Sequence, residues 1–534
     1  MKAPSGAFLV RVFENSSLGR VVQQGAPGTV WQPTADRNLV DSSSLTGRTV
    51  VSDYGTNDPN DVRFWIINND GAISQFYPSG SLSKITTKDE NWIKTNGKVG
   101  TTEEYRDFEG RLVLKRKWET AISASNTYFV YDDFGDLRYI IPPGFTATTL
   151  LEAGTGDFHE FIYAYRYDNR RRLIERKVPG KGWDHLVYNK NNQLVQQQDA
   201  ELRKSNKWIV TKYDVFGRPV ITGIHQGSNP RQTEQDYMNQ QTILWEQRLP
   251  GQLIYSNASY PQNNFTTLTV NYYDDYTFEN AGLLPAKGIV KSANTQSLVT
   301  GVLVYKEDGT MPLLTVNYYD DNGRLIQTAA QNHLKGTDYV TNTYNFEGTV
   351  VKSTKTHTSV TGEVLTIVTT FEYDHMNRLV QTKKKVNSQA EIIQSKISYN
   401  EIGQMKGKGL HSENGTTFMT NIDYEYNERG WAKRVNSPHF TESLAYNDAS
   451  ANKLYNGNIA EKKWRYGNEV VKTTYFTYDA LNRLKTGKSE GILMNEEVMY
   501  DNMGAIGYQV IIMALTRGLG SLGTIPSSTP QPAY

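Results

Sequence analysis

The residues that most often carry out metal or nucleophilic chemistry are sparse in this 534-residue chain. Its eight histidines show no His-x-x-x-His or His-Glu-x-x-His spacing, the patterns that turn two imidazoles toward one metal ion. The absence of cysteine excludes disulfides, thiolate nucleophiles and Cys-ligated zinc. No Gly-x-Ser-x-Gly sequence supplies the nucleophile of an α/β-hydrolase. We therefore predict no metal and no catalytic residue of these kinds.

Carboxylates are abundant, with 56 Asp and Glu residues in the chain. A glycosidase needs two of them about 5–10 Å apart across a sugar. The sequence singles out no such pair, because the recurring Asp lies where a turn is expected and turn capping explains it. We therefore predict that the chain is not an enzyme.

One glycine pattern has the form of a dinucleotide site, Gly518-Leu519-Gly520-Ser521-Leu522-Gly523. Such a site needs a helix behind the glycines and an acidic residue about 20 positions further on. Only 11 residues follow Gly523. The pattern therefore predicts no cofactor, and we interpret 508–534 as a low-complexity, disordered tail.

Charge and hydropathy exclude further classes of partner. The chain has 57 Lys and Arg, a net charge of +1, so the whole chain has no electrostatic reason to bind nucleic acid. We interpret the runs 170–172 (Arg) and 383–385 (Lys) as solvated faces or guards of edge strands. The longest apolar run, 508–515, is far shorter than the roughly 20 residues of a membrane span. No secretory signal peptide is visible at the start of the chain.

A repeated five-residue frame organises the rest of the sequence: Tyr, then Asp or Asn, two variable residues, and Gly or Asn. Eight copies pair Tyr131 with Gly135, Tyr213 with Gly217, Tyr319 with Gly323, Tyr373 with Asn377, Tyr399 with Gly403, Tyr426 with Gly430, Tyr478 with Asn482, and Tyr500 with Gly504. Two further good copies begin at Tyr188 and Tyr344, and several copies continue as Arg-Leu.

The frame has a direct physical interpretation. Gly and Asn are the residues that adopt a positive φ most easily, and an Asp or Asn side chain accepts hydrogen bonds from nearby backbone N–H groups in a turn. The segments before the Tyr and after the turn are rich in β-formers, such as 473–478 and 324–328. Each copy therefore predicts a β-hairpin, ending one strand at the Tyr and starting the next near the Arg-Leu pair.

A single hairpin is marginally stable, so about a dozen hairpins must pair with one another. An open twisted sheet rarely exceeds about ten strands before it curls. We therefore predict an all-β fold in which tandem hairpins are wound into a large curled sheet, shell or open barrel. The predicted organisation is a β-rich N-terminal plug or set of first strands over 1–100, the repeat array over 101–507, and the tail. The repeat array is interrupted at 226–250, where the sequence predicts one helix or a long loop.

The tandem Tyr-Asp-x-x-Gly-Arg-Leu units resemble the YD repeats of RHS-repeat proteins over about residues 10–507. Four other stretches are similar to RHS proteins of Bacteroidetes: 18–20 (LGR), 24–28 (QGAPG), 88–92 (KDENW) and 139–144 (YIIPPG). The resemblance implies a hollow, non-enzymatic bacterial β-shell, secreted or at the cell surface, that in full-length relatives encloses a C-terminal effector or toxin domain. The family's core segment and effector do not follow residue 504, so we expect a truncated fragment.

The regularly placed tyrosines leave a second function open. Tyr rows on a sheet stabilise it as cross-strand pairs, and exposed rings can also stack on sugars. The alternative prediction is therefore a cell-surface adhesion or carbohydrate-binding protein. The partners considered are a C-terminal effector domain, a cell-surface component and carbohydrate.

Overall fold

The computed structural model describes residues 8–153, 156–490 and 494–513. Within these ranges the chain forms 35 strands, three short α-helices and four 3₁₀ helices. Hydrogen bonding assigns 32 strands to one antiparallel sheet and β4, β5 and β11 to a second. The predicted all-β class with tandem hairpins is confirmed. None of the described helices has the length and apolar character needed to cross a membrane.

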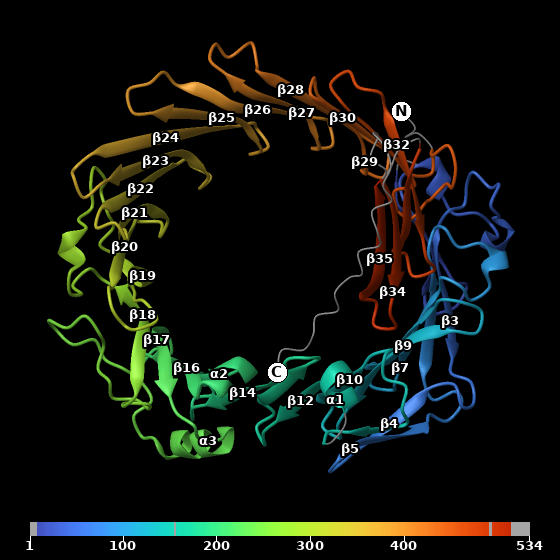
Figure 1. Cartoon of the computed structure of the whole chain (residues 1–534), viewed down its shortest axis with the longest axis horizontal. Helices are drawn as coiled ribbons and strands as arrows, with labels where there is room; N and C mark the ends of the chain where they lie inside the picture. Colours follow the sequence, from blue (N-terminus) through green and yellow to red (C-terminus); the bar gives the residue numbers. More distant parts are fainter. Residues whose placement is uncertain (1–7, 154–155, 491–493, 514–534) are drawn as a thin grey trace. The chain divides into compact units, whose positions relative to one another are not determined.

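The chain divides into two compact units. Figure 1 labels strands and helices of both. Unit 1 comprises Met1–Tyr165, Val178–Gly180 and Ile422–Tyr534, and unit 2 comprises Arg166–Lys177 and Lys181–Asn421.

Unit 1 contains the first twelve strands and the last eight, except for residues 166–167 at the end of β12 and 420–421 at the start of β28. Its elements are β1 (Val10–Phe13), β2 (Val21–Gly25), η1 (Thr29–Trp31), η2 (Arg37–Leu39), β3 (Val50–Thr56), β4 (Arg63–Asn68), β5 (Gly71–Phe76), β6 (Ser83–Lys88), η3 (Lys94–Asn96), β7 (Thr102–Arg106), β8 (Leu112–Trp118), β9 (Ala124–Tyr131), β10 (Leu137–Ile141), β11 (Thr149–Leu151), α1 (Gly156–Phe161), β12 (Tyr163–Tyr167), β28 (Thr420–Tyr426), β29 (Ala432–Asn436), β30 (Phe440–Ala445), β31 (Glu461–Tyr466), β32 (Lys472–Tyr478), β33 (Leu484–Ser489), β34 (Met494–Tyr500) and β35 (Ile506–Met513).

Unit 2 contains the middle strands. Its elements are β13 (Leu173–Val178), β14 (Gly182–Tyr188), β15 (Leu194–Gln198), α2 (Ala200–Lys204), β16 (Lys207–Tyr213), β17 (Pro219–Gln226), α3 (Arg231–Gln240), β18 (Phe265–Asp274), η4 (Ala281–Leu283), β19 (Thr295–Val304), β20 (Leu313–Tyr319), β21 (Leu325–Gln331), β22 (Thr337–Tyr344), β23 (Val350–Thr358), β24 (Val364–Tyr373), β25 (Leu379–Val386), β26 (Ile392–Tyr399) and β27 (Met405–Ser412).

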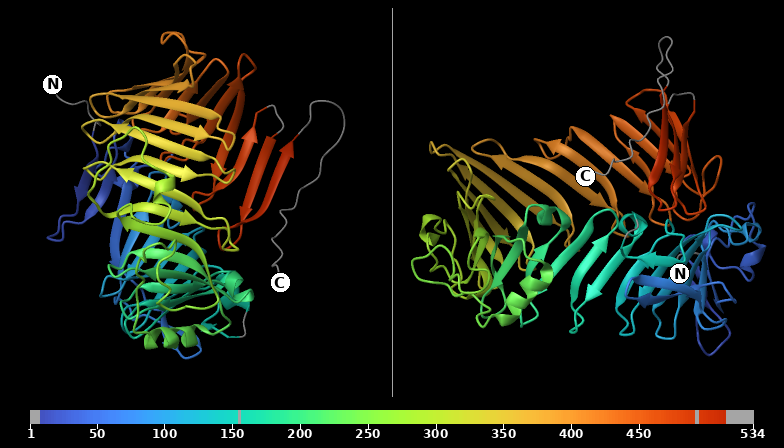
Figure 2. Two further views of the ribbon diagram at one scale, coloured as in Figure 1. Left: turned by 90° about the vertical axis from the view of Figure 1, so that its left-hand side faces the viewer. Right: turned by 60° about the horizontal axis from the view of Figure 1, so that its bottom comes forward.

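Successive strands of unit 2 pair with their neighbours in sequence, as the side view shows (Figure 2). The N-terminal segment of unit 1 departs from this order. There β3 pairs with β6, while the β4–β5 hairpin between them joins β11 in the three-stranded sheet. The segment assigned to 1–100 thus contributes strands to both sheets.

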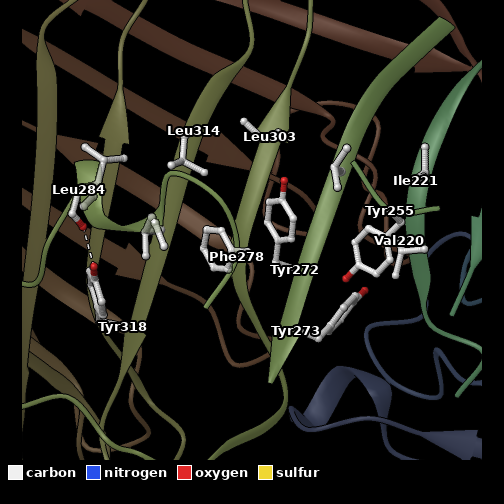
Figure 3. Close-up of a cluster of buried hydrophobic side chains, with 14 of the residues drawn as sticks. Val220, Ile221, Tyr255, Tyr272, Tyr273, Phe278, Leu284, Leu303, Leu314 and Tyr318 are labelled. Carbon is white, nitrogen blue, oxygen red and sulfur yellow. Dashed lines mark hydrogen bonds between the residues drawn. The ribbon is translucent and has the colours of Figure 1, made fainter. Parts of the chain in front are cut away.

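Unit 2 has a hydrophobic core where connecting segments cover the sheet. The ring of Tyr272 stacks on Phe278 at 4.2 Å, and the Tyr318 hydroxyl donates to the Leu284 carbonyl at 2.6 Å (Figure 3). Phe278 and Leu284 lie in the segment between β18 and β19, which packs on the buried side chains of the strands. By contrast, β23 to β26 contain no buried residue, so strand pairing and side-chain contacts between hairpins must hold them.

Two boundaries can be compared with the predictions. The segment 226–250 contains one helix, α3, which is followed by an irregular stretch up to β18. At the C-terminal end β35 continues to Met513, so this strand extends past the predicted array boundary at residue 507. The rest of the predicted tail, including the glycine pattern at 518–523, lies outside the described residues.

Candidate functional site

The repeated frame forms the same turn at each copy. Each tyrosine ends a strand, and the ladder shifts register there so that the Tyr opposes the residue six positions later. These pairs are Tyr131 with Leu137, Tyr213 with Pro219, Tyr319 with Leu325, Tyr373 with Leu379, Tyr399 with Met405, Tyr426 with Ala432, Tyr478 with Leu484, and Tyr500 with Ile506. Gly135, Gly217, Gly323, Asn377, Gly403, Gly430, Asn482 and Gly504 all have positive φ.

The residue after the tyrosine holds the turn together. In the β20–β21 turn, Asp320 Oδ1 accepts the backbone N–H groups of Asn322 at 3.0 Å and Arg324 at 2.9 Å. Arg324 Nε donates to the other carboxylate oxygen at 2.7 Å. In the β24–β25 turn, the side-chain hydrogen bond from Arg378, followed by its backbone hydrogen bond, lowers the pKa of Asp374 to about 2. The carboxylate is therefore charged at neutral pH and matches the backbone donors and the guanidinium.

The tyrosine hydroxyl links one hairpin to the hairpin before it. The hydroxyl of Tyr344, at the end of β22, donates at 2.8 Å to the carbonyl of Leu325, which opens β21. The same bond recurs from Tyr131 to Leu112, Tyr188 to Leu173, Tyr213 to Leu194, Tyr319 to Val299, Tyr373 to Val350, Tyr399 to Leu379, Tyr478 to Ile459, and Tyr500 to Leu484.

The arginine of one frame lies over the tyrosine ring of the next. The Arg324 guanidinium is 5.0 Å from the ring centroid of Tyr344, and the Arg378 guanidinium is 4.6 Å from that of Tyr399. We call three contacts together the interhairpin lock. They are the hydrogen bond between the turn Asp and its Arg, the cation–π contact of that Arg with the Tyr ring of the next frame, and the hydrogen bond from that Tyr hydroxyl to the carbonyl at the start of the preceding strand. Sequence reasoning missed the lock, although the Arg-Leu pair after the glycine was its visible signal.

In unit 1 the N-terminal segment packs against the C-terminal repeats. Trp31 Nε1 donates to the Tyr455 carbonyl at 2.8 Å, and its ring meets Trp431 edge-on at 5.6 Å. Arg429 pairs with Glu90 at 3.2 Å, and burial raises the pKa of that carboxyl. Residues this far apart in sequence carry no local signal of their contact, so sequence reasoning could not find it.

A buried ion pair in unit 2 fixes the irregular segment after α3. Lys212 Nζ lies 3.1 Å from Glu246 Oε1, with the two side chains 1% and 0% exposed. Glu246 also accepts hydrogen bonds from Ser256, Ala258 and Ser259. Through these hydrogen bonds, this carboxylate holds the segment in place.

The fixed segment closes one side of a cavity of about 420 Å³ next to the β16–β17 turn. Phe216, Trp245, Tyr255 and Tyr273 contribute rings to its lining. Within the described ranges, no group of three or more His, Asp or Glu side chains is placed to hold a metal ion.

Comparison with known proteins gives a match in structure only. No protein-family profile matches this chain, and no curated protein matches it either. The fold is similar to a chain in the crystal structure of TcdB2-TccC3, with a TM-score of 0.57, 13% identity, and coverage of 94% of this chain and 24% of that chain. A chain of the Photorhabdus luminescens Tc holotoxin pore with a mutated TccC3 gives a TM-score of 0.49 and 10% identity, covering 94% of this chain and 22% of its own.

This chain thus spans about a quarter of the length of the TcdB2-TccC3 chain that it matches. At 13% identity the likeness establishes a shared fold and no more. The fold and the interhairpin lock define a class: a β-rich protein of tandem hairpins.

Proposed function

We propose that this chain is a structural, non-enzymatic wall of the RHS type, which in a longer protein encloses a C-terminal effector or toxin domain. The single observation that carries the proposal is the interhairpin lock, repeated along a fold that is shared with TcdB2-TccC3. The matched chain of that structure is much longer than this one, because the match covers 94% of this chain and only 24% of that chain.

The lock suits a wall because it stabilises a sheet that has little core. Along β23 to β26 no side chain is buried, so burial of apolar area contributes little there. Each frame instead supplies a hydrogen bond and a cation–π contact to its neighbour. A wall assembled in this way can be long and thin.

Three finer points belong to the same proposal. The stretches similar to RHS proteins of Bacteroidetes indicate an origin in that group. The match covers only 24% of the similar chain, which indicates that this chain is part of a longer protein. Enclosure of an effector implies release to the cell surface or exterior, which is the location we propose.

The test uses the complete polypeptide encoded by the gene, digested with a protease of broad specificity. We expect a domain after residue 534 to survive digestion in the intact protein, and to be degraded when Arg324→Gln and Arg378→Gln weaken two locks. A complete polypeptide without such a domain, or a domain cleaved as fast in the intact protein as after denaturation, would contradict the proposal.

The alternative function, carbohydrate binding at a cell surface, is favoured by the cavity beside Trp245. Aromatic rings that border a cavity are the groups that stack on sugar faces, and Phe216 is 78% exposed at its rim. A glycan array tests this alternative. Specific binding that Trp245→Ala abolishes, while Trp464→Ala in β31 preserves it, would favour carbohydrate binding over the wall, and an array without specific signals would remove the alternative.

A further inference from the structure

Two adjoining cavities in unit 2 lie beside one copy of the interhairpin lock, in which Arg172 bonds to Asp168 and lies over the Tyr188 ring. Their volumes are about 560 Å³ and 730 Å³, within the range of ligand pockets in proteins. Ile174, Arg231 and Gln232 line both cavities, so the two are continuous around the start of α3. The first cavity also takes in Arg203 of α2, and the second takes in the turn before β13.

The lining carries an excess of positive charge. Its cations are Arg170, Arg172, Lys190, Arg203 and Arg231, and its carboxylates are Asp168 and Glu175. Both carboxylates are already engaged: Arg172 Nε donates to Asp168 at 2.7 Å, and Arg166, outside the cavities, donates to Glu175 at 2.7 Å. The cavities therefore have a net charge of +3 over their lining residues when His185 is neutral.

Three of these cations bond to neutral acceptors. Arg170 donates to the Asn192 side chain at 3.2 Å, and Lys190 donates to the Gln241 carbonyl at 2.8 Å. Arg203 donates to the Trp183 carbonyl at 2.7 Å. These contacts orient the cations and leave their charge uncompensated, a state that an anion in the cavity would relieve.

Arg231 contacts a neutral and a charged acceptor. It bonds to Gln232 Oε1 at 2.6 Å, and its Nε forms an ion pair with Glu175 Oε1 at 3.7 Å. Burial, and then the positive charge of Arg203, lowers the pKa of His185, so this imidazole is neutral. Its Nδ1 lies 3.2 Å from Arg203 Nη1 and accepts that donor.

We propose that the two cavities together bind an acidic peptide segment. Guanidinium groups pair with carboxylates in a planar, bidentate geometry. Amide side chains, which both donate and accept hydrogen bonds, suit the peptide groups between the carboxylates. The amides of the lining are Asn169, Asn189, Gln198, Asn206, Asn229, Gln232, Gln235 and Asn239. Tyr167 is the only Phe, Tyr or Trp among the lining residues, which disfavours a sugar ligand because sugars need rings to stack on.

The experiment measures binding of a fluorescein-labelled peptide of alternating Glu and Gly to the full chain by fluorescence anisotropy. We expect binding that weakens with added salt, and no binding of the matched Gln–Gly peptide. Arg170 and Lys190 are exposed, so Arg170→Gln with Lys190→Gln should fold normally. Losing two charge-assisted bonds should weaken binding by roughly tenfold or more.

A matched control removes the same charge elsewhere in unit 2. Lys352 and Lys355 are exposed on β23, outside both cavities. Lys352→Gln with Lys355→Gln should leave binding within about twofold of the parent chain. Arg203→Gln, with unchanged circular dichroism, should weaken binding as the first pair does.

Three results would overturn the proposal. The first is equal binding of the Glu and Gln peptides. The second is an equal loss of affinity in the Lys352/Lys355 control, which would mean a diffuse electrostatic attraction. The third is binding of heparin, but not of the Glu peptide, that is lost in the Arg170/Lys190 variant, because this would assign the cavities to a sulfated polysaccharide.

Discussion

Removing one hydroxyl from the interhairpin lock should loosen two hairpins of unit 2. The Tyr399 hydroxyl donates at 2.8 Å to the carbonyl of Leu379, and Tyr399→Phe deletes this bond while keeping the ring. A hydrogen bond of this kind contributes about 0.5–1.5 kcal/mol net. Because β24 to β26 have no buried residue to compensate, we expect the full effect to appear locally.

Native-state hydrogen exchange with mass spectrometry measures this local opening. Peptides from β25 and β26 should exchange about fivefold faster, the factor that corresponds to about 1 kcal/mol. Tyr305→Phe is the matched control, since no hydrogen bond of its hydroxyl is found within the described part of the chain, and it should change exchange little. Wild-type exchange rates in Tyr399→Phe, or an equal acceleration in Tyr305→Phe, would refute the role assigned to the hydroxyl.

The ring of Tyr399 provides a second, independent measurement. The Arg378 guanidinium lies 4.6 Å from the ring centroid, a contact that contributes about 0.5–1 kcal/mol at exposed sites. Arg378→Gln should therefore cost the same in the parent chain and in the Tyr399→Phe background, because both keep a ring. In the Tyr399→Leu background its cost should fall by the cation–π contribution, and an unchanged cost there would contradict the contact.

Three further predictions concern the turns and the buried ion pair. The folded-state pKa of Asp374, about 2, lies below its unfolded value near 3.9, so its stabilisation is complete above about pH 4 and is lost as the pH falls toward 2. Hydrogen exchange of β24 and β25 should accelerate over that interval, and Asp374→Asn should flatten the dependence. Gly323 has φ +73° and an added Cβ would meet nothing closer than 3.9 Å, so Gly323→Ala should cost about 1–2 kcal/mol from the backbone alone. Asn377→Gly keeps the positive φ and loses the exposed hydrogen bond from Asn377 to Thr349 at 2.9 Å, so it should cost no more than about 1 kcal/mol; urea titration of both variants measures the difference. Lys212→Met leaves Glu246 buried without its cation and should cost about 3–5 kcal/mol, while adding Glu246→Gln should recover part of that loss in thermal unfolding, and a double variant no more stable than the single one would contradict the ion-pair argument.

The hairpins could be predicted because their signal is local. The turn at Tyr319–Gly323 needs only a capping carboxylate and a residue with positive φ, and both lie within five positions of the sequence. The all-β class followed from the same units. The ion pair of Lys212 with Glu246 had no such signal, because it joins a strand to an irregular segment 34 residues away.

The cavities show a different limit of prediction. The basic run at 170–172 predicts a solvated face or a guard of an edge strand. Which cations lie together depends on the path of the chain, since α3 brings Arg231 next to a strand more than 50 residues earlier in sequence. Net charge over the whole chain, +1, hides this local excess.

The sequence by itself determined the repeating unit, its strand–turn–strand form and the residues at each turn, because those depend on φ preferences and short-range hydrogen bonds. Only the tertiary structure decided what each unit does for its neighbour. The Tyr399 hydroxyl reaches Leu379 and the Arg378 guanidinium reaches Tyr399 because strand pairing brings residues about 20 positions apart into contact. The sequence identifies the repeated Tyr and Arg residues, and the fold is needed to show that they are in contact.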